Sequence, residues 1–154
     1  MNKQRIGVLV MCTGNSCRSQ MFEAYLKHFA GDRFNVVSAG TEPAGEVHPL
    51  TLQVLNEDGL DTTGMVPKDY RVFLGKLAVY YLIIVCDGAA RSCPSVWPGV
   101  MERLIWPFED PAVFEGSDSE KLERFRIVRD QIKARVRSWI DERSPLSNDS
   151  RTAQ

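Results

Sequence analysis

The amino-acid sequence predicts a single α/β domain of three layers, built around a four-stranded, parallel, doubly wound sheet. Apolar runs typical of strands alternate along the chain with the spacing of amphipathic helices, which is the pattern of a parallel sheet. The runs are short and unbroken, as in strands with two buried faces. With 154 residues, 44% hydrophobic and 25% charged, the chain is long enough for one hydrophobic core.

The four strands are predicted from runs of branched and aromatic residues. They cover residues 6–11, 34–38, 79–85 and 104–106. The first ends at Cys12, the third ends at Cys86, and Asp110 follows the fourth. Ligands of doubly wound sheets bind beyond the carboxyl ends of the strands, where the strand order reverses. If the first and third strands are neighbours, both sulfurs face one crevice and Asp110 lines its rim.

Helices are expected between these strands and after the last one. The first begins near Ser19, the second begins at His48-Pro49 and ends at Gly59, and Pro67 is expected to open a third. Their predicted inward residues are Met21, Phe22, Tyr25 and Phe29, then Leu52 and Leu55, then Tyr70, Phe73 and Leu77. Ser117 and Glu120 form a capping box for a long final helix. Its buried stripe is predicted to be Leu122, Phe125, Val128, Ile132, Val136 and Trp139.

Residues 1–142 are therefore predicted to form the folded domain, and the polar residues 143–154 a disordered tail. The net charge of −1 gives no reason to expect binding to nucleic acid or to an anionic membrane. The first apolar run is too short for a signal peptide, and no run approaches the length of a membrane span. We therefore expect a cytoplasmic protein, in which the four cysteines are reactive thiols and not structural disulfides.

The polar loop between the first strand and the first helix is typical of an anion site. It reads Cys12, Thr13, Gly14, Asn15, Ser16, Cys17, Arg18 and Ser19. Backbone amides at a helix start point toward the loop, and the helix dipole favours negative charge there. Gly14 and Asn15 are the residues best able to adopt the tight backbone conformation that lets amides converge. Arg18 adds a planar fork for two oxygens of a tetrahedral oxyanion.

Cys12 is the candidate nucleophile of this loop. Its place beside the helix start predicts a stabilised thiolate, and Ser19 is expected to donate a further hydrogen bond to the sulfur. A buried strand-end cysteine beside a coincidental arginine is the alternative. The strand before the loop and the helix after it favour the catalytic interpretation.

Two further features follow the third and fourth strands. Cys86 and Cys93 are either two buried apolar cysteines or a redox pair, and a reactive Cys12 nearby favours the pair. Asp110 is either part of a turn with Pro111 or a general acid that reaches the crevice. A zinc site is not expected, because no C-x2-C pair is present and the chain has only two histidines.

The motifs resemble one superfamily over most of the chain. CTGNSCRS at 12–19 is similar to the phosphate loop of the low-molecular-weight protein tyrosine phosphatases, and hence to their fold. The chain resembles more closely the thioredoxin-coupled arsenate reductases of that fold, through NVVSAG at 35–40, FEDP at 108–111 and FRIVRDQI at 125–132. The Cys86-x6-Cys93 pair separates the two branches, because phosphatase chemistry does not need it.

This resemblance implies a three-cysteine reduction of arsenate to arsenite. Cys12 attacks arsenate held by Arg18 and the loop amides, and Asp110 assists the loss of water. Cys86 then forms a disulfide with Cys12, and Cys93 attacks Cys86 to leave a Cys86–Cys93 disulfide. Reduced thioredoxin or a glutaredoxin-type thiol is the expected electron donor, with no tightly bound cofactor. Phosphate or sulfate is expected to compete with arsenate, and a monomer is expected.

Some members of the superfamily bind potassium near the loop, through residues that match Asn15, Glu23 and Ser38. In this chain Val66 and Lys68 stand where other ligands of that ion would lie, so we expect a lysine ammonium in place of the cation and no bound metal. The alternative function is a low-molecular-weight protein tyrosine phosphatase that forms a cysteinyl-phosphate. A non-enzymatic arsenic or redox sensor is disfavoured, because the charge balance shows no partner surface.

Overall fold

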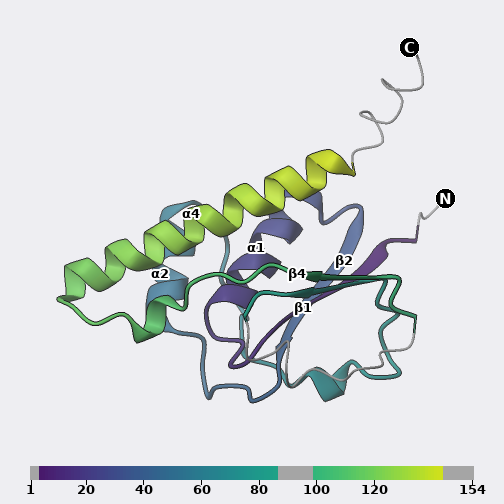
Figure 1. The fold of residues 1–154 in the computed structure, drawn as a ribbon, viewed down its shortest axis with the longest axis horizontal. Helices are drawn as coiled ribbons and strands as arrows, with labels where there is room; N and C mark the ends of the chain where they lie inside the picture. The colour runs from purple at the N-terminus through teal and green to yellow at the C-terminus, as the bar shows by residue number, and fades with distance from the viewer. Residues whose placement is uncertain (1–3, 87–98, 144–154) are drawn as a thin grey trace, which may run out of the picture.

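The sheet of the protein is centred on its first strand. The structure, a computed structural model, describes residues 4–86 and 99–143. Its strands are β1 (Ile6–Cys12), β2 (Phe34–Gly40), β3 (Tyr81–Ile84) and β4 (Glu102–Ile105). They form one parallel sheet in the order β2-β1-β3-β4 (Figure 1). The predicted four-stranded parallel sheet is therefore confirmed.

The strand order reverses at β1, and this reversal brings two cysteines to one edge of the sheet. Cys12 pairs with Gly40 at the end of β2, and Met11 pairs with Ile84 at the end of β3. The amide of Val85 still donates to the carbonyl of Met11 at 3.0 Å, and Cys86 follows Val85, with its sulfur beside Thr13 and Cys12. The condition set by the sequence, that the first and third strands are neighbours, is met.

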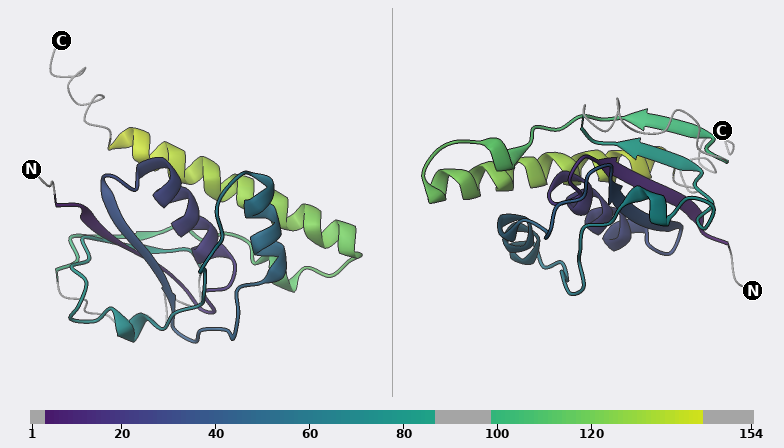
Figure 2. Two further views of the ribbon diagram at one scale, coloured as in Figure 1. Left: turned by 180° about the vertical axis from the view of Figure 1, so that it is seen from behind. Right: turned by 90° about the horizontal axis from the view of Figure 1, so that it is seen from below.

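Helices cover one face of the sheet, and the later part of the connection from β2 to β3, after α2, lies on the other. The helices of the described residues are α1 (Arg18–Ala30), α2 (Pro49–Glu57) and α4 (Asp118–Glu142). Figure 1 shows α1 and α4 above the sheet, and Figure 2 shows the 3₁₀ turn η1 (Tyr70–Val72) on its opposite side. A second 3₁₀ turn, η2 (Pro111–Val113), follows β4. The sheet is thus the middle of three layers.

The final helix forms as its sequence predicts. Ser117 accepts from the amide of Glu120 while the Glu120 carboxylate accepts from the amide of Ser117, so the predicted capping box is confirmed. The buried residues of α4 are Phe125, Val128, Ile132, Val136 and Trp139, whereas Leu122 is half-buried. Trp139 packs against Phe34 of β2 and against Trp106, which follows β4, and this joins α4 to both edges of the sheet.

The helix predicted from Pro67 is wrong. The segment contains only the short turn η1, and none of its residues is fully buried. Lys68 and Asp69 are instead held against the sheet: the Lys68 carbonyl accepts from the amide of Gly40 at 2.8 Å, and Asp69 bridges Gly40. These long-range bonds use backbone groups that a helix would need for itself, so tertiary contacts override the local preference.

Smaller corrections concern element ends and one helix face. The third strand is Tyr81–Ile84, shorter than the predicted 79–85, and the fourth is Glu102–Ile105, two residues earlier at its start than the predicted 104–106. In α2 the buried residues are Thr51, Val54 and Leu55, whereas Leu52 is only half-buried. Cys93 and the tail beyond Arg143 lie outside the described residues.

Candidate active site

The peptide carbonyls of the loop after β1 face outward. Four of them accept from backbone amides of the segment after β2: Cys12 from Thr41 (3.3 Å), Thr13 from Glu42 (2.9 Å), Gly14 from Ala44 (2.9 Å) and Ser16 from His48 (3.0 Å). The carbonyl of Asn15 accepts from the side-chain amide of Gln20 at 3.1 Å. The N–H and C=O of a planar trans peptide point in opposite directions. The amides of residues 13–17 therefore face the inside of the loop, where they form an anion-binding cradle at the start of α1.

Two residues make this tight path possible. Asn15 adopts a left-handed conformation with φ 53°, as the sequence predicts for this residue. At the end of β2, a Cβ on Gly40 would lie 2.4 Å from the carbonyl oxygen of Thr13. Any side chain at position 40 would therefore displace the loop. Gly14, in contrast, would meet only ordinary contacts with a side chain.

The sulfur of Cys12 lies among these amides and is almost fully buried. It accepts from the backbone N–H of Asn15 at 3.2 Å and lies 2.8 Å from the hydroxyl oxygen of Ser19. Asn15 Nδ2 donates to that hydroxyl oxygen at 2.8 Å, so the Ser19 hydrogen remains for the sulfur. The hydrogen bond predicted from Ser19 to Cys12 is therefore confirmed.

The side chain of Asn15 connects the cradle to a buried polar network. Asn15 Nδ2 donates to Ser38 at 2.9 Å, Ser38 donates to the carboxylate of Glu23, and Asn15 Oδ1 accepts from the amide of Lys68 at 2.8 Å. The ammonium of Lys68 lies 3.5 Å from Glu23 and donates to the carbonyl of Val66 at 3.1 Å. The Lys68 ammonium thus lies between the Glu23 carboxylate and the Val66 carbonyl.

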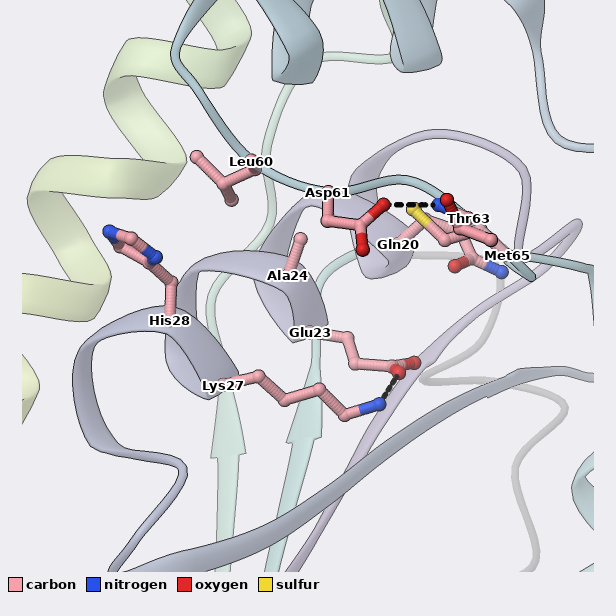
Figure 3. Close-up of a pocket in the computed structure, with 9 residues that line it drawn as sticks. All are labelled: Gln20, Glu23, Ala24, Lys27, His28, Leu60, Asp61, Thr63 and Met65. Carbon is pink, nitrogen blue, oxygen red and sulfur yellow. Dashed lines mark hydrogen bonds and ion pairs between the residues drawn. The ribbon is translucent and has the colours of Figure 1, made fainter.

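A cavity of about 360 Å³ opens next to this network, between α1 and the segment after α2. Gln20, Glu23 and Lys27 form its α1 wall, and Figure 3 shows the ion pair between Glu23 and Lys27 at its edge. Neither Cys12 nor Arg18 lines this cavity. Among the described residues, no group of three or more His, Cys, Asp or Glu side chains is arranged to hold a metal ion.

Arg18 and Asp110 face each other at the rim of the cradle. Arg18 Nη2 lies 3.5 Å from Asp110 Oδ2, and Arg18 Nη1 donates to the carbonyl of Phe108 at 3.0 Å. The Arg18 side chain is 15% exposed and that of Asp110 34% exposed. Asp110 also accepts from the amide of Ala112 at 3.0 Å, which fixes it at the start of η2. The Phe108 carbonyl thus orients the guanidinium of Arg18, and the Asp110 carboxylate lies beside that guanidinium.

Cys86 brings a second thiol to the first. It is 3% exposed, as is Cys12, and the two thiols lie close enough to influence each other's ionisation. The Thr13 hydroxyl lies 3.5 Å from the Cys86 sulfur. The hydrogen bond with Cys86 and burial together raise the pKa of Cys12 well above its ordinary value, against the lowering effect of Ser19. This differs from the stabilised thiolate that the sequence predicts, and the neighbouring thiol is the physical reason.

Sequence reasoning missed three groups that support the site. Gln20 holds the Asn15 carbonyl, Thr51 donates to the carbonyl of Ser16 at 3.1 Å, and the backbone of Phe108 holds Arg18. Gln20 and Thr51 are polar residues at fully buried helix positions, and their interruption of apolar faces was the available signal. The Phe108 contact uses a carbonyl, which no residue type reveals.

Comparison with known families agrees with this geometry. Residues 7–150 match the profile of the family described as low molecular weight phosphotyrosine protein phosphatase. The chain belongs to this family. The loop of inward-facing amides, with Cys12 and Arg18, is therefore the candidate oxyanion loop of this chain, and Asp110 lies beside it.

The relatives that match most of this chain include several arsenate reductases. The arsenate reductase of Halalkalibacterium halodurans is 40% identical over 141 residues, covering 92% of this chain and 98% of the relative. A solved arsenate reductase in the phosphate-binding state has a TM-score of 0.74 and 32% identity, covering 89% of this chain and 98% of that one. The thioredoxin-dependent arsenate reductase of Corynebacterium glutamicum has a TM-score of 0.69 and 29% identity, covering 91% of this chain and 62% of that one.

The described part of the chain contains no helix that is both long and apolar enough to span a membrane.

Proposed function

We propose that the protein is an arsenate reductase that converts arsenate to arsenite with electrons from thiols. One observation carries this proposal: a second buried thiol, Cys86, lies beside the candidate nucleophile Cys12, where the chain leaves the neighbouring strand β3. A phosphatase needs one cysteine, whereas reduction of As(V) to As(III) needs the two electrons that two thiols supply when they form a disulfide. The arsenate reductases to which the chain is similar support the same function.

In the first step, the loop amides and Arg18 bind arsenate and Cys12 attacks the arsenic. For the monoanion H₂AsO₄⁻, the Cys12 thiol forms an S–As bond and one oxygen leaves as water, which carries the thiol proton. Asp110, held beside Arg18 at the rim, passes that proton to the leaving oxygen. The arsenic remains As(V), and the product is a covalent adduct on Cys12.

In the second step, Cys86 attacks the sulfur of Cys12. The S–S bond forms as the S–As bond breaks, and the electron pair of that bond passes to arsenic, which leaves as the arsenite H₂AsO₃⁻. The Cys86 proton accounts for the second hydrogen of this product. The Thr13 hydroxyl beside the Cys86 sulfur supports the developing thiolate. The thiols of Cys12 and Cys86 thus supply the two electrons of the reaction.

In the third step, Cys93 attacks Cys86, which returns Cys12 as a thiol and leaves a Cys86–Cys93 disulfide. An external dithiol then reduces this disulfide. We propose a thioredoxin or glutaredoxin-type protein as the donor and a monomeric enzyme, and the thioredoxin-dependent relative supports a donor of this kind. Phosphate and sulfate are expected to compete with arsenate, because the cradle binds by shape and charge.

Hydrolysis of aryl phosphates is the second candidate activity. The match to the phosphatase family and the triad of Cys12, Arg18 and Asp110 favour it, because these residues suffice for a cysteinyl-phosphate intermediate. We expect it as a weak side activity.

The test is arsenate-dependent oxidation of NADPH with a thioredoxin or glutaredoxin system, measured beside hydrolysis of p-nitrophenyl phosphate. We expect turnover of arsenate with at least one donor system and formation of stoichiometric arsenite. Efficient hydrolysis of the aryl phosphate without any arsenate-dependent NADPH oxidation would overturn the reductase and establish the phosphatase.

A further inference from the structure

The start of α2 holds one peptide of the oxyanion loop. The carbonyl of Ser16 accepts two hydrogen bonds, one from the backbone N–H of His48 at 3.0 Å and one from the Thr51 hydroxyl at 3.1 Å. Both donors come from the first turn of α2 and the residue that precedes it. The carbonyl of Ser16 is therefore drawn away from the inside of the loop.

The Thr51 hydroxyl has one hydrogen and a carbonyl oxygen can only accept, so this hydrogen goes to the Ser16 carbonyl. Thr51 thus holds the Ser16–Cys17 peptide by its carbonyl.

The position of Thr51 is itself fixed. Thr51 is fully buried, in an α2 face whose other buried members are Val54 and Leu55. His48 Nδ1 accepts from the amide of Leu50 at 3.1 Å, and the His48 ring packs against Phe125 of α4 with centroids 4.7 Å apart. Burial lowers the pKa of His48, which keeps Nδ1 available as an acceptor. The first turn of α2 is therefore a rigid base for the loop.

We propose that Thr51 is a positioning residue for oxyanion binding: by holding the Ser16 carbonyl outward, it aims the backbone N–H of Cys17 into the cradle. The N–H of Cys17 belongs to the same planar peptide as the Ser16 carbonyl and points the opposite way. It lies at the start of α1, where the helix dipole adds to its attraction for an anion. The inference rests on the proposed function, because it assigns Thr51 to the oxyanion-binding step of that reaction.

The test compares sulfate binding to four forms of the full chain by isothermal titration calorimetry at pH 7. Sulfate is a suitable probe because its charge does not change near neutral pH. Thr51→Val keeps the shape but removes the hydroxyl, and Thr51→Ser keeps the hydroxyl. Thr62→Val is the matched control, since the Thr62 hydroxyl donates to Asn56 at 3.1 Å in a segment away from the loop.

We expect Thr51→Val to weaken sulfate binding about tenfold, the effect of one misdirected hydrogen bond to a charged group. Thr51→Ser should restore wild-type affinity within about twofold, and Thr62→Val should leave it unchanged. Alkylation of Cys12 by iodoacetamide without sulfate, followed by fragment-ion mass spectrometry, should be the same in all four forms. The reason is that Asn15 and Ser19, which contact the Cys12 sulfur, are held from the other side of the loop.

Sulfate affinity of Thr51→Val equal to that of wild type would overturn the inference, as would a change in Cys12 alkylation as large as the change in sulfate affinity. If Thr51→Val does not fold, Thr51→Ala carries the same expectation, because alanine fits the site without a hydroxyl. A wild-type protein that binds sulfate but fails to reduce arsenate would overturn the proposed function and leave the role of Thr51 standing.

Discussion

Cys12 ends β1, Cys86 lies two residues after the neighbouring parallel strand β3, and the two are equally buried, yet their surroundings differ. The sulfur of Cys12 has two donors aimed at it, the amide of Asn15 and the hydroxyl of Ser19, and each donor is held by further hydrogen bonds. The sulfur of Cys86 has the Thr13 hydroxyl at 3.5 Å and the thiol of Cys12 as neighbours. Cys12 and Cys86 are thus two different reactive groups, although both are buried and lie at the same edge of the sheet.

The difference indicates that the two thiols at this edge of the sheet have separate tasks: Cys12 reacts with the bound oxyanion, and Cys86 completes the reduction. The donors around Cys12 belong to the cradle that binds the oxyanion, so Cys12 is the sulfur that reacts with arsenic. Cys86 lies beside Cys12 and Thr13, so the sulfur with which we expect it to react is that of Cys12. Four experiments test this separation, beginning with the largest expected effect.

Cys12→Ser is expected to lower both arsenate reduction and aryl-phosphate hydrolysis by at least about 1,000-fold, because both reactions begin on the Cys12 sulfur. The two rates are measured by NADPH oxidation and p-nitrophenol release, with sulfate binding as the check that the cradle is intact. Residual arsenate reduction above about a tenth of the wild-type rate would contradict this role of Cys12.

Cys86→Ser is expected to remove arsenate turnover but to leave most aryl-phosphate hydrolysis, because Cys86 acts only after the oxyanion is bonded to Cys12. The ratio of the two activities is the measurement. A parallel loss of both activities in a folded variant would place Cys86 in the oxyanion site and remove the separation.

Arg18→Lys is expected to lower the kcat/KM of both reactions by about 100-fold, since an ammonium cannot replace the planar fork that the Phe108 carbonyl orients. Competitive inhibition by sulfate should weaken in parallel. Unchanged inhibition constants for sulfate would show that Arg18 is not an oxyanion ligand.

The smallest effect concerns the pH dependence of Cys12. The hydrogen bond with Cys86 is the largest cause of the raised pKa of Cys12, so Cys86→Ala should lower that pKa. More thiolate is then present at any pH below the wild-type pKa, and the alkylation profile of Cys12 should shift to lower pH. A shift to higher pH would show that Cys86 stabilises the thiolate instead.

The sequence predicted structure and site best where the interacting residues are close together in the chain. The apolar run of β1, the polar loop and the amphipathic start of α1 predict both the anion site and the place of Cys12, Arg18 and Ser19. The capping box at Ser117 predicts α4 for the same reason, since its bonds join residues close in the chain.

Contacts between distant segments were harder to predict. The Lys68 backbone bonds to Asn15 and Gly40, and these partners prevent the helix that Pro67 suggests. The sequence predicts only leucines on the inward face of α2 and therefore misses Thr51, whose hydroxyl donates to the Ser16 carbonyl of the loop. The pKa of Cys12 depends on Cys86, which is remote in sequence, so the local helix start predicted the wrong direction.

The outward anchoring of all five loop carbonyls has a consequence for substrate choice. A cradle assembled this way reads only the size and charge of a tetrahedral anion, and in these respects phosphate and arsenate are nearly alike. Selectivity for arsenate must therefore arise after capture. Phosphorus(V) on Cys12 has no accessible lower oxidation state to accept the electron pair when Cys86 attacks, whereas arsenic(V) does. Phosphate then leaves by hydrolysis or simple release, and the protein discriminates between phosphate and arsenate by their redox chemistry.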